Sequence, residues 1–229
     1  MHSKSAGRSI LIEDQCIGPL WSVRWHLRRS LSWINKRDLE GLSCIRLVDK
    51  LPEPSLTSPE AIKIAFEQGL NIYGLYYNRH PPYIVLNISD IYRGVPMVYW
   101  LTPVPTLLIA YSLAHEVAHH IVATRGRGCV IKAGESLKPN EQEEVFADKY
   151  AFSVLERMSK RWYYRLGKWA IRDLSDWHYI SGISAWRSKD YVSAAEHWHN
   201  AWALHANNNE AAYWYKRAKE MLKDSQNSL

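Results

Sequence analysis

Hydrophobic and polar positions follow two different periods along the chain, which predicts both helices and strands. Apolar residues recur at helical spacing over residues 19–34, beside an arginine-rich polar side. A second helix is expected over residues 61–68, because Ser58 and Pro59 suit its start and Gly69 ends it. The expected strands are residues 43–48, 71–77 and 83–88, and the last two should form a hairpin around the turn-rich residues 78–82.

The strongest hydrophobic pattern lies at residues 106–123, where nearly every residue except three histidines and one glutamate is apolar or aromatic. A helix that is hydrophobic on all sides is buried, so its polar side chains need partners. Another helix is expected from Pro139 or Asn140 to Met158, with Asn140 as its N-cap and acidic residues in its first turn.

The character of the chain changes after Met158. Residues 160–174 predict one helix, residues 176–209 resemble a single tetratricopeptide (TPR) repeat of about 34 residues, and residues 210–222 predict a capping helix. Small and large residues mark the repeat at Gly182, Asp190, Tyr191, Ala194, Trp198 and Ala201. One repeat rarely stands alone, so we expect these helices either to present a partner surface or only to complete the core.

The polar residues of the apolar helix form the motif His115-Glu116-x-x-His119. Histidines at positions i and i+4 project from one helix face and can bind one metal ion, and the glutamate after the first can hold a water molecule on that metal. A catalytic zinc ion takes three protein ligands, so a third is expected downstream. The metzincin arrangement is excluded, because Val122 and Arg125 stand where it needs a glycine and a histidine.

The preferred third ligand is Glu144, on the helix that should end at Met158. Glu144 shares a helix face with Asp148 and with two alanines that would allow close approach to another helix. Glu144 would bind the metal, and Asp148 would fix a ligand histidine through its other ring nitrogen. Glu141 and Glu143 are the alternatives, which we interpret as ordinary solvated charges.

The two motifs together resemble those of gluzincin metallopeptidases, most closely of the ImmA/IrrE type. That pattern, HExxH followed by ExxA[ND]x[FY]Axx[LV]L, is met by His115 to His119 and by Glu144 to Leu155. The resemblance covers about residues 45–158. HtpX-like membrane proteases share the ExxAD element, so that element alone does not separate the two groups.

The resemblance implies a zinc-dependent peptidase with an α+β, zincin-like fold that has a small β-sheet and an active-site helix. It implies Zn2+ bound by His115, His119 and Glu144, with Glu116 as the general base. In gluzincins an edge strand beside the active-site helix receives the extended substrate. The candidate edge strand here is Tyr83, Ile84, Val85, Leu86 and Asn87. The implied substrate is a protein or peptide, such as a DNA-binding regulatory protein.

The net charge of +6 is compatible with nucleic acid or an acidic partner. Cations and aromatic residues interleave over residues 157–172, a mixture that can stack against and neutralise a single strand. The interpretation we prefer is an amphipathic helix that buries its aromatic side chains. Nucleic-acid binding is therefore an alternative that is not favoured.

Composition favours neither secretion nor membrane insertion. Residues 1–18 are expected to be a loose leader, and residues 1–8 are polar and basic without the apolar segment of a secretory signal. Residues 95–114 carry no charge, but Pro96, Pro103 and Pro105 interrupt them, which favours a loop and a buried helix over a membrane span. The three cysteines lie far apart without a CxxC pair, which favours a cytoplasmic location.

The sequence thus predicts a zincin-like metallopeptidase domain over residues 1–158 and a helical TPR-like region over residues 159–229. The expected function is hydrolysis of peptide bonds in a protein substrate, with a further protein partner for the TPR-like region. Two alternatives stay open. One is a DNA-linked protease or nucleic-acid-binding protein, and the other is a non-catalytic TPR scaffold with a structural zinc ion.

Overall fold

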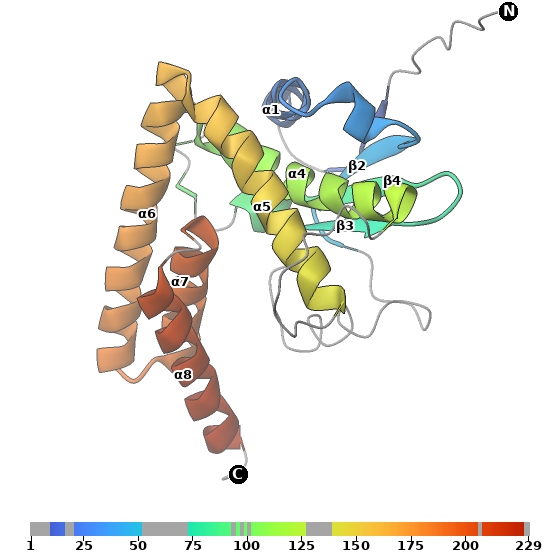
Figure 1. Cartoon of the computed structure of the whole chain (residues 1–229). Helices are drawn as coiled ribbons and strands as arrows, with labels where there is room; N and C mark the ends of the chain where they lie inside the picture. Colours follow the sequence, from blue (N-terminus) through green and yellow to red (C-terminus); the bar gives the residue numbers. More distant parts are fainter. Residues whose placement is uncertain are drawn as a thin grey trace, which may run out of the picture. The chain divides into compact units, whose positions relative to one another are not determined.

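The computed structural model describes residues 10–16, 21–51, 73–92, 95–96, 99, 102–126, 139–205 and 208–226. The chain divides into two compact units, and each is described by itself. Unit 1 comprises Met1–Tyr92 and Pro105–Met158, and unit 2 comprises Arg93–Val104 and Ser159–Leu229. The described residues combine a small mixed sheet with helices (Figure 1), which confirms the predicted α+β class.

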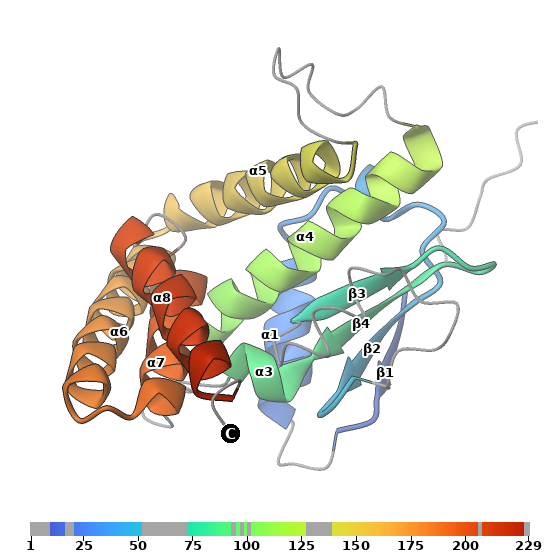
Figure 2. The same ribbon diagram turned by 90° about the horizontal axis from the view of Figure 1, so that it is seen from below.

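Unit 1 contains a four-stranded sheet in the order β1-β2-β4-β3 (Figure 2). The strands are β1 Leu11–Asp14, β2 Cys44–Val48, β3 Gly74–Tyr77 and β4 Tyr83–Asn87. β1, β2 and β4 run parallel, whereas β3 pairs antiparallel with β4 and forms the predicted hairpin. Nearly every residue of β2 and β4 is buried, as expected for interior strands covered on both faces.

The prediction that Tyr83–Asn87 forms a substrate-binding edge strand is wrong. β4 pairs with β2 on one side and with β3 on the other, so its backbone groups are already used. Among the described strands, β3 lies at that edge of the sheet. An apolar run shows that a segment is a strand, but not which neighbours it pairs with, because pairing depends on residues distant in the sequence.

The structure also differs from the loose leader expected over residues 1–18. Leu11–Asp14 pairs in parallel with β2, and Nε of Arg46 donates to Oε2 of Glu13 at 2.7 Å across the pair. This strand has four residues and exposes Leu11, so its sequence carries too little periodicity to be recognised. The rest of the predicted leader lies outside the described residues.

Unit 1 contains nearly all of the long apolar helix α4, Val104–Arg125. Against it lies α1, Trp21–Leu31, where Nδ1 of His26 is 2.6 Å from the Thr106 hydroxyl and Ser30 donates to the Thr106 carbonyl at 3.0 Å. These bonds satisfy polar groups in a buried helix contact. The other helices of this unit are η1 Lys36–Leu39, a 3-10 helix, α3 Ile88–Tyr92 and α5 Pro139–Ser159.

The two helices that the metal motif requires are confirmed in position. α4 contains the predicted residues 106–123, and its first N–H, on Val104, donates to Oγ1 of Thr102 at 3.2 Å. α5 begins at Pro139, one residue before the predicted cap, where a proline fits the first turn. The predicted helix over residues 61–68 lies outside the described residues. Within the described part of the chain, no helix has both the length and the apolar character needed to cross a membrane.

Unit 2 is a run of three helices, in which α7 packs against both α6 and α8. They are α6 Trp162–Arg187, α7 Tyr191–Leu204 and α8 Asn209–Gln226. Asp190 caps α7 by accepting a hydrogen bond from the Ser193 N–H at 3.0 Å. The expected break between residues 174 and 176 is wrong, since α6 continues through it and the sequence there contains neither glycine nor proline. TPR identity remains a prediction.

The core of unit 2 depends on one close approach between α6 and α7. A Cβ atom at Gly182 would lie 2.5 Å from Nε1 of Trp198, so the tryptophan fits only because position 182 has no side chain. Trp198 is fully buried, donates from Nε1 to the Tyr179 carbonyl at 3.2 Å and stacks on Trp214 with ring centroids 5.5 Å apart. Large and small residues therefore interlock here as the sequence pattern indicated.

Candidate metal centre

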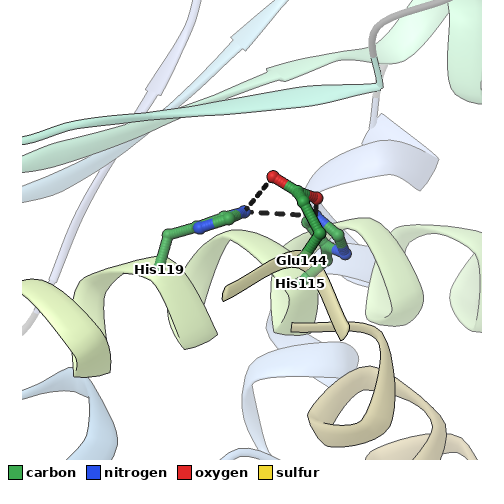
Figure 3. Close-up of side chains that lie close together, drawn as sticks. All are labelled: His115, His119 and Glu144. Carbon is green, nitrogen blue, oxygen red and sulfur yellow. Dashed lines mark hydrogen bonds and ion pairs between the residues drawn. The ribbon is translucent and has the colours of Figure 1, made fainter. Parts of the chain in front are cut away.

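His115 and His119 lie one turn apart on α4, and their Nε2 atoms are 3.2 Å apart. Opposite them, Glu144 of α5 places Oε2 3.2 Å from Nε2 of His115 and Oε1 3.6 Å from Nε2 of His119. The three side chains point toward one another (Figure 3), and one donor atom from each lies within 4.8 Å of the others. The structure therefore brings together the three residues that the sequence analysis predicted as ligands, in a group that could hold a metal ion.

The separation of the two histidine nitrogens fits a tetrahedral ion. Zinc–nitrogen and zinc–oxygen bonds of about 2.0–2.2 Å in a tetrahedron place neighbouring donors about 3.3–3.6 Å apart. The 3.2 Å between the two Nε2 atoms is close to the edge of such a tetrahedron, and Glu144 offers a different oxygen to each histidine, Oε2 at 3.2 Å to His115 and Oε1 at 3.6 Å to His119. Two imidazoles and one carboxylate are also a donor set that zinc uses in catalytic sites.

The outer nitrogen of each histidine meets a carboxylate. Nδ1 of His115 lies 3.1 Å from Oδ1 of Asp148, and Nδ1 of His119 lies 2.7 Å from Oε1 of Glu143. Each carboxylate favours the proton on Nδ1, so a metal ion at the centre of the group would have to displace only the proton on Nε2. Asp148 thus lies where the sequence predicted it, beside one of the histidines.

Glu143 is a residue that sequence reasoning missed, because it was interpreted as a solvated charge. Its side chain is 33% exposed and is held by His119. Glu143 lies off the helix face that contains Glu144 and Asp148, so periodicity gave no signal. The only indication available was chemical, since two ligand histidines need two orienting acceptors.

Tyr111 is a second residue of the site that sequence reasoning did not single out. Its hydroxyl donates to Oδ1 of Asp148 at 2.8 Å, the same oxygen that faces His115. Burial, followed by the Asp148 carboxylate, raises the pKa of Tyr111, so the hydroxyl stays protonated as a donor. Tyr111 lies one turn before His115 on α4, and this spacing is the signal that could have identified it.

The carboxylates around His115 stabilise positive charge. Burial lowers its pKa, but hydrogen bonds to Asp148 and Glu144 outweigh burial and raise the pKa of His115 to about 10. The hydrogen bond from His115 in turn lowers the pKa of Glu144, despite partial burial. A group of ligands that favours a proton in this way also favours a divalent cation at the same place.

The three side chains of the group differ in how far they are exposed to solvent. The side chains of His115 and His119 are 19% and 16% exposed, whereas that of Glu144 is 60% exposed. The two imidazoles are therefore largely enclosed, and the Glu144 carboxylate is the part of the group that is most exposed to solvent.

Glu116 is buried directly after His115 and faces strand β3. It is 7% exposed, and a Cβ atom at Gly74 of β3 would lie 2.8 Å from its Cγ. Burial raises the pKa of the Glu116 carboxyl, while the charges of His115 and His119 and the Tyr76 N–H act in the opposite direction. A carboxyl with a raised pKa beside the metal-binding group suits exchange of protons.

The third histidine of the motif segment, His120, belongs to the core. It is 1% exposed, its Nε2 lies 2.9 Å from the Glu40 carbonyl and its Nδ1 lies 3.2 Å from the Tyr76 hydroxyl. Both ring nitrogens therefore have partners in the protein, and His120 takes no part in the metal-binding group.

Comparisons of the chain with protein-family models, with curated proteins and with solved structures give no match. The interpretation of the site rests on its residues and their geometry.

Proposed function

We propose that the protein is a zinc-dependent endopeptidase with a zincin-like catalytic domain. The observation that carries the proposal is the convergence of donor atoms from His115, His119 and Glu144 on one place, with both histidines oriented by carboxylates. The resemblance of the motifs to those of ImmA/IrrE-type peptidases supports the same conclusion. Zinc bound by these residues would supply a Lewis acid and lower the pKa of water to about 7.

Glu116 serves as the general base in this proposal. Its carboxylate accepts a proton from the attacking water and then delivers that proton to the leaving amine of the peptide. Burial supports this role, because a raised pKa brings the carboxyl closer to neutral pH, where it can both accept and release a proton.

The substrate-binding edge moves from β4 to β3. The Asn87 N–H donates to the Tyr73 carbonyl at 2.9 Å, so Tyr73 faces β4 and, by alternation, the backbone groups of Gly74 and Tyr76 face away from it. That side of β3 faces Glu116. The Tyr76 N–H on this side is held by Glu116, so an extended peptide that pairs with β3 would replace that contact or use the remaining backbone groups, and in either case would pass beside Glu116.

A catalytic zinc ion is better supported than a structural one. Structural sites usually have four protein ligands, often cysteines. Here the group found among the described residues has three donors and includes no cysteine. A protein or peptide substrate is accordingly proposed, with a DNA-binding regulatory protein as the class that the resemblance suggests.

The first test is metal content by mass spectrometry on the purified protein. About one zinc per chain is expected in the wild type, and Glu144→Ala should lose it, because a carboxylate donor is removed. Lys149→Ala, on an exposed position of the same helix, should keep its zinc. Absence of zinc from the wild type after reconstitution would contradict the proposal.

The second test is proteolysis of an unfolded protein such as reduced casein. The zinc-loaded wild type should cleave it, and 1,10-phenanthroline should stop cleavage. A protein that binds zinc stoichiometrically but cleaves neither casein nor a mixed peptide library would instead favour the scaffold alternative.

A further inference from the structure

Helix α6 has apolar residues on two opposite faces. The buried face includes Tyr164, Gly167, Leu174, His178 and Gly182. On the other side Trp162, Leu166, Trp169, Trp177 and Ile180 are exposed by 70%, 55%, 66%, 53% and 65%. The outward face of a surface helix is ordinarily polar, so this second apolar face needs an explanation.

The exposed residues form one stripe. At about 100° per residue, these five positions fall within a sector of about 80°, and the buried residues cluster on the opposite side. The interpretation that the aromatic residues of this segment are buried is therefore wrong for Trp162 and Trp169, although it holds for Tyr164.

A row of cations runs beside the first half of the stripe. Arg161, Arg165, Lys168 and Arg172 repeat at helical spacing, and no acidic residue occurs from residue 157 to residue 172. No ion pair in the described part of the chain involves these four side chains. The first turn of α6 also contains no acidic residue, and the N-cap residue Arg161 makes no side-chain hydrogen bond to the end of the helix. The positive end of the helix dipole therefore adds to the same field.

We propose that this part of α6 docks on an anionic membrane surface. The α6 patch consists of Arg161, Trp162, Arg165, Leu166, Lys168, Trp169 and Arg172. In an interfacial helix, tryptophan and leucine enter the boundary between headgroups and acyl chains while arginine and lysine contact lipid phosphates. The patch ends at Arg172, because Asp173 follows on the apolar stripe itself. This mode of binding requires no membrane-spanning segment.

The geometry favours lipid over single-stranded nucleic acid. Trp162 and Trp169 are seven residues apart, which separates them by about 10.5 Å along the helix axis. Leu166 lies between them on the same stripe and offers no ring for a base to stack on. A convex row of aromatic and aliphatic side chains fits a soft apolar layer better than it fits a strand of stacked bases.

A second copy of the chain is disfavoured by charge. If two α6 patches packed face to face, their arginine and lysine rows would approach each other without acidic residues to pair with. An anionic lipid surface neutralises the same row, since each cation near such a surface is attracted to it.

The test is co-sedimentation of the full chain with vesicles of phosphatidylcholine, alone or with phosphatidylglycerol. Binding to the anionic vesicles is expected, with a loss of about tenfold or more on neutral vesicles or in high salt. Trp162→Ser/Trp169→Ser should weaken partitioning about tenfold or more, because two interfacial side chains are removed. Arg165→Glu/Arg172→Glu should remove the preference for anionic vesicles.

Matched controls are Tyr213→Ser and Lys216→Glu, both on α8, where Tyr213 is 61% exposed and Lys216 is exposed. They should bind vesicles like the wild type. Circular dichroism of every variant checks that its helical content equals that of the wild type. No binding of the wild type to anionic vesicles would overturn the proposal, as would equal losses in the control variants. Binding to a labelled oligonucleotide but not to vesicles, or self-association abolished by the tryptophan changes, would overturn it in favour of nucleic acid or a second copy.

Discussion

Glu143 and His119 are joined by a hydrogen bond of 2.7 Å between Oε1 and Nδ1, shorter than the 3.1 Å between Asp148 and the other histidine of the group. A short bond to a carboxylate fixes the ring and its tautomer. Glu143 therefore orients His119 within the group that could hold a metal ion, although it contributes none of the three donor atoms.

Glu143→Ala is predicted to weaken zinc affinity by about 10–100-fold while the protein stays folded, because His119 loses the acceptor that orients it. Competition with a chromophoric chelator measures the change in affinity. Lys149→Ala is the matched control, since it alters an exposed position on the same helix. Affinity equal to that of the wild type would show that the Glu143 contact does not hold the ring.

Glu116→Gln is predicted to keep zinc and lose activity. The amide has nearly the same shape but cannot accept and release the proton, so kcat/KM should fall by about 10²–10⁴-fold. Zinc content measured on the same sample serves as the internal control. Turnover at the wild-type rate by a zinc-loaded Glu116→Gln protein would contradict the role assigned to Glu116.

Gly74→Ala is predicted to reduce activity through Glu116. The new Cβ would lie 2.8 Å from Cγ of Glu116 and 3.0 Å from Oε1, so the carboxylate has to move. A displacement of about 1 Å can cost on the order of 100-fold in rate. Zinc should remain bound, because no donor atom changes, and Gly74→Val should show a larger loss. An active Gly74→Ala protein would mean that the carboxylate acts from another position.

The sequence predicted elements that are specified locally. The apolar residues 106–123 lie within α4, the start of α5 near Pro139 is correct, and the β3–β4 hairpin is present. His115 and His119 were identified because their spacing alone places them on one face of a helix. Each of these features depends on residues that are close in the sequence.

Features that depend on distant residues were missed or misplaced. β1 is recognised only through its pairing with β2, and β4 is interior because it pairs with β2 on one side and with β3 on the other. Glu143 contacts His119 because α5 is turned about its own axis so that this side chain faces α4. The spacing of residues within α5 does not predict that orientation. Both the order of the strands and the contact between Glu143 and His119 therefore depend on tertiary packing, which local sequence patterns do not show.

Unit 2 allows a test of its own packing, independent of metal. In Gly182→Ala, the added methyl group meets three atoms of the Trp198 ring at 2.5–2.8 Å, and a fully buried ring has little room to move. Overpacking of this kind typically costs about 1–3 kcal/mol, more than the roughly 1 kcal/mol that replacing a helical glycine by alanine gains. We therefore predict a lower urea midpoint for Gly182→Ala than for the wild type. Ser184→Ala, at an exposed position of the same helix, should change stability by no more than about 0.5 kcal/mol.

A Gly182→Ala protein more stable than the wild type would contradict this prediction. It would show that α6 and α7 can separate to accept the methyl group, and that the close approach at Gly182 is not what holds this helix pair together.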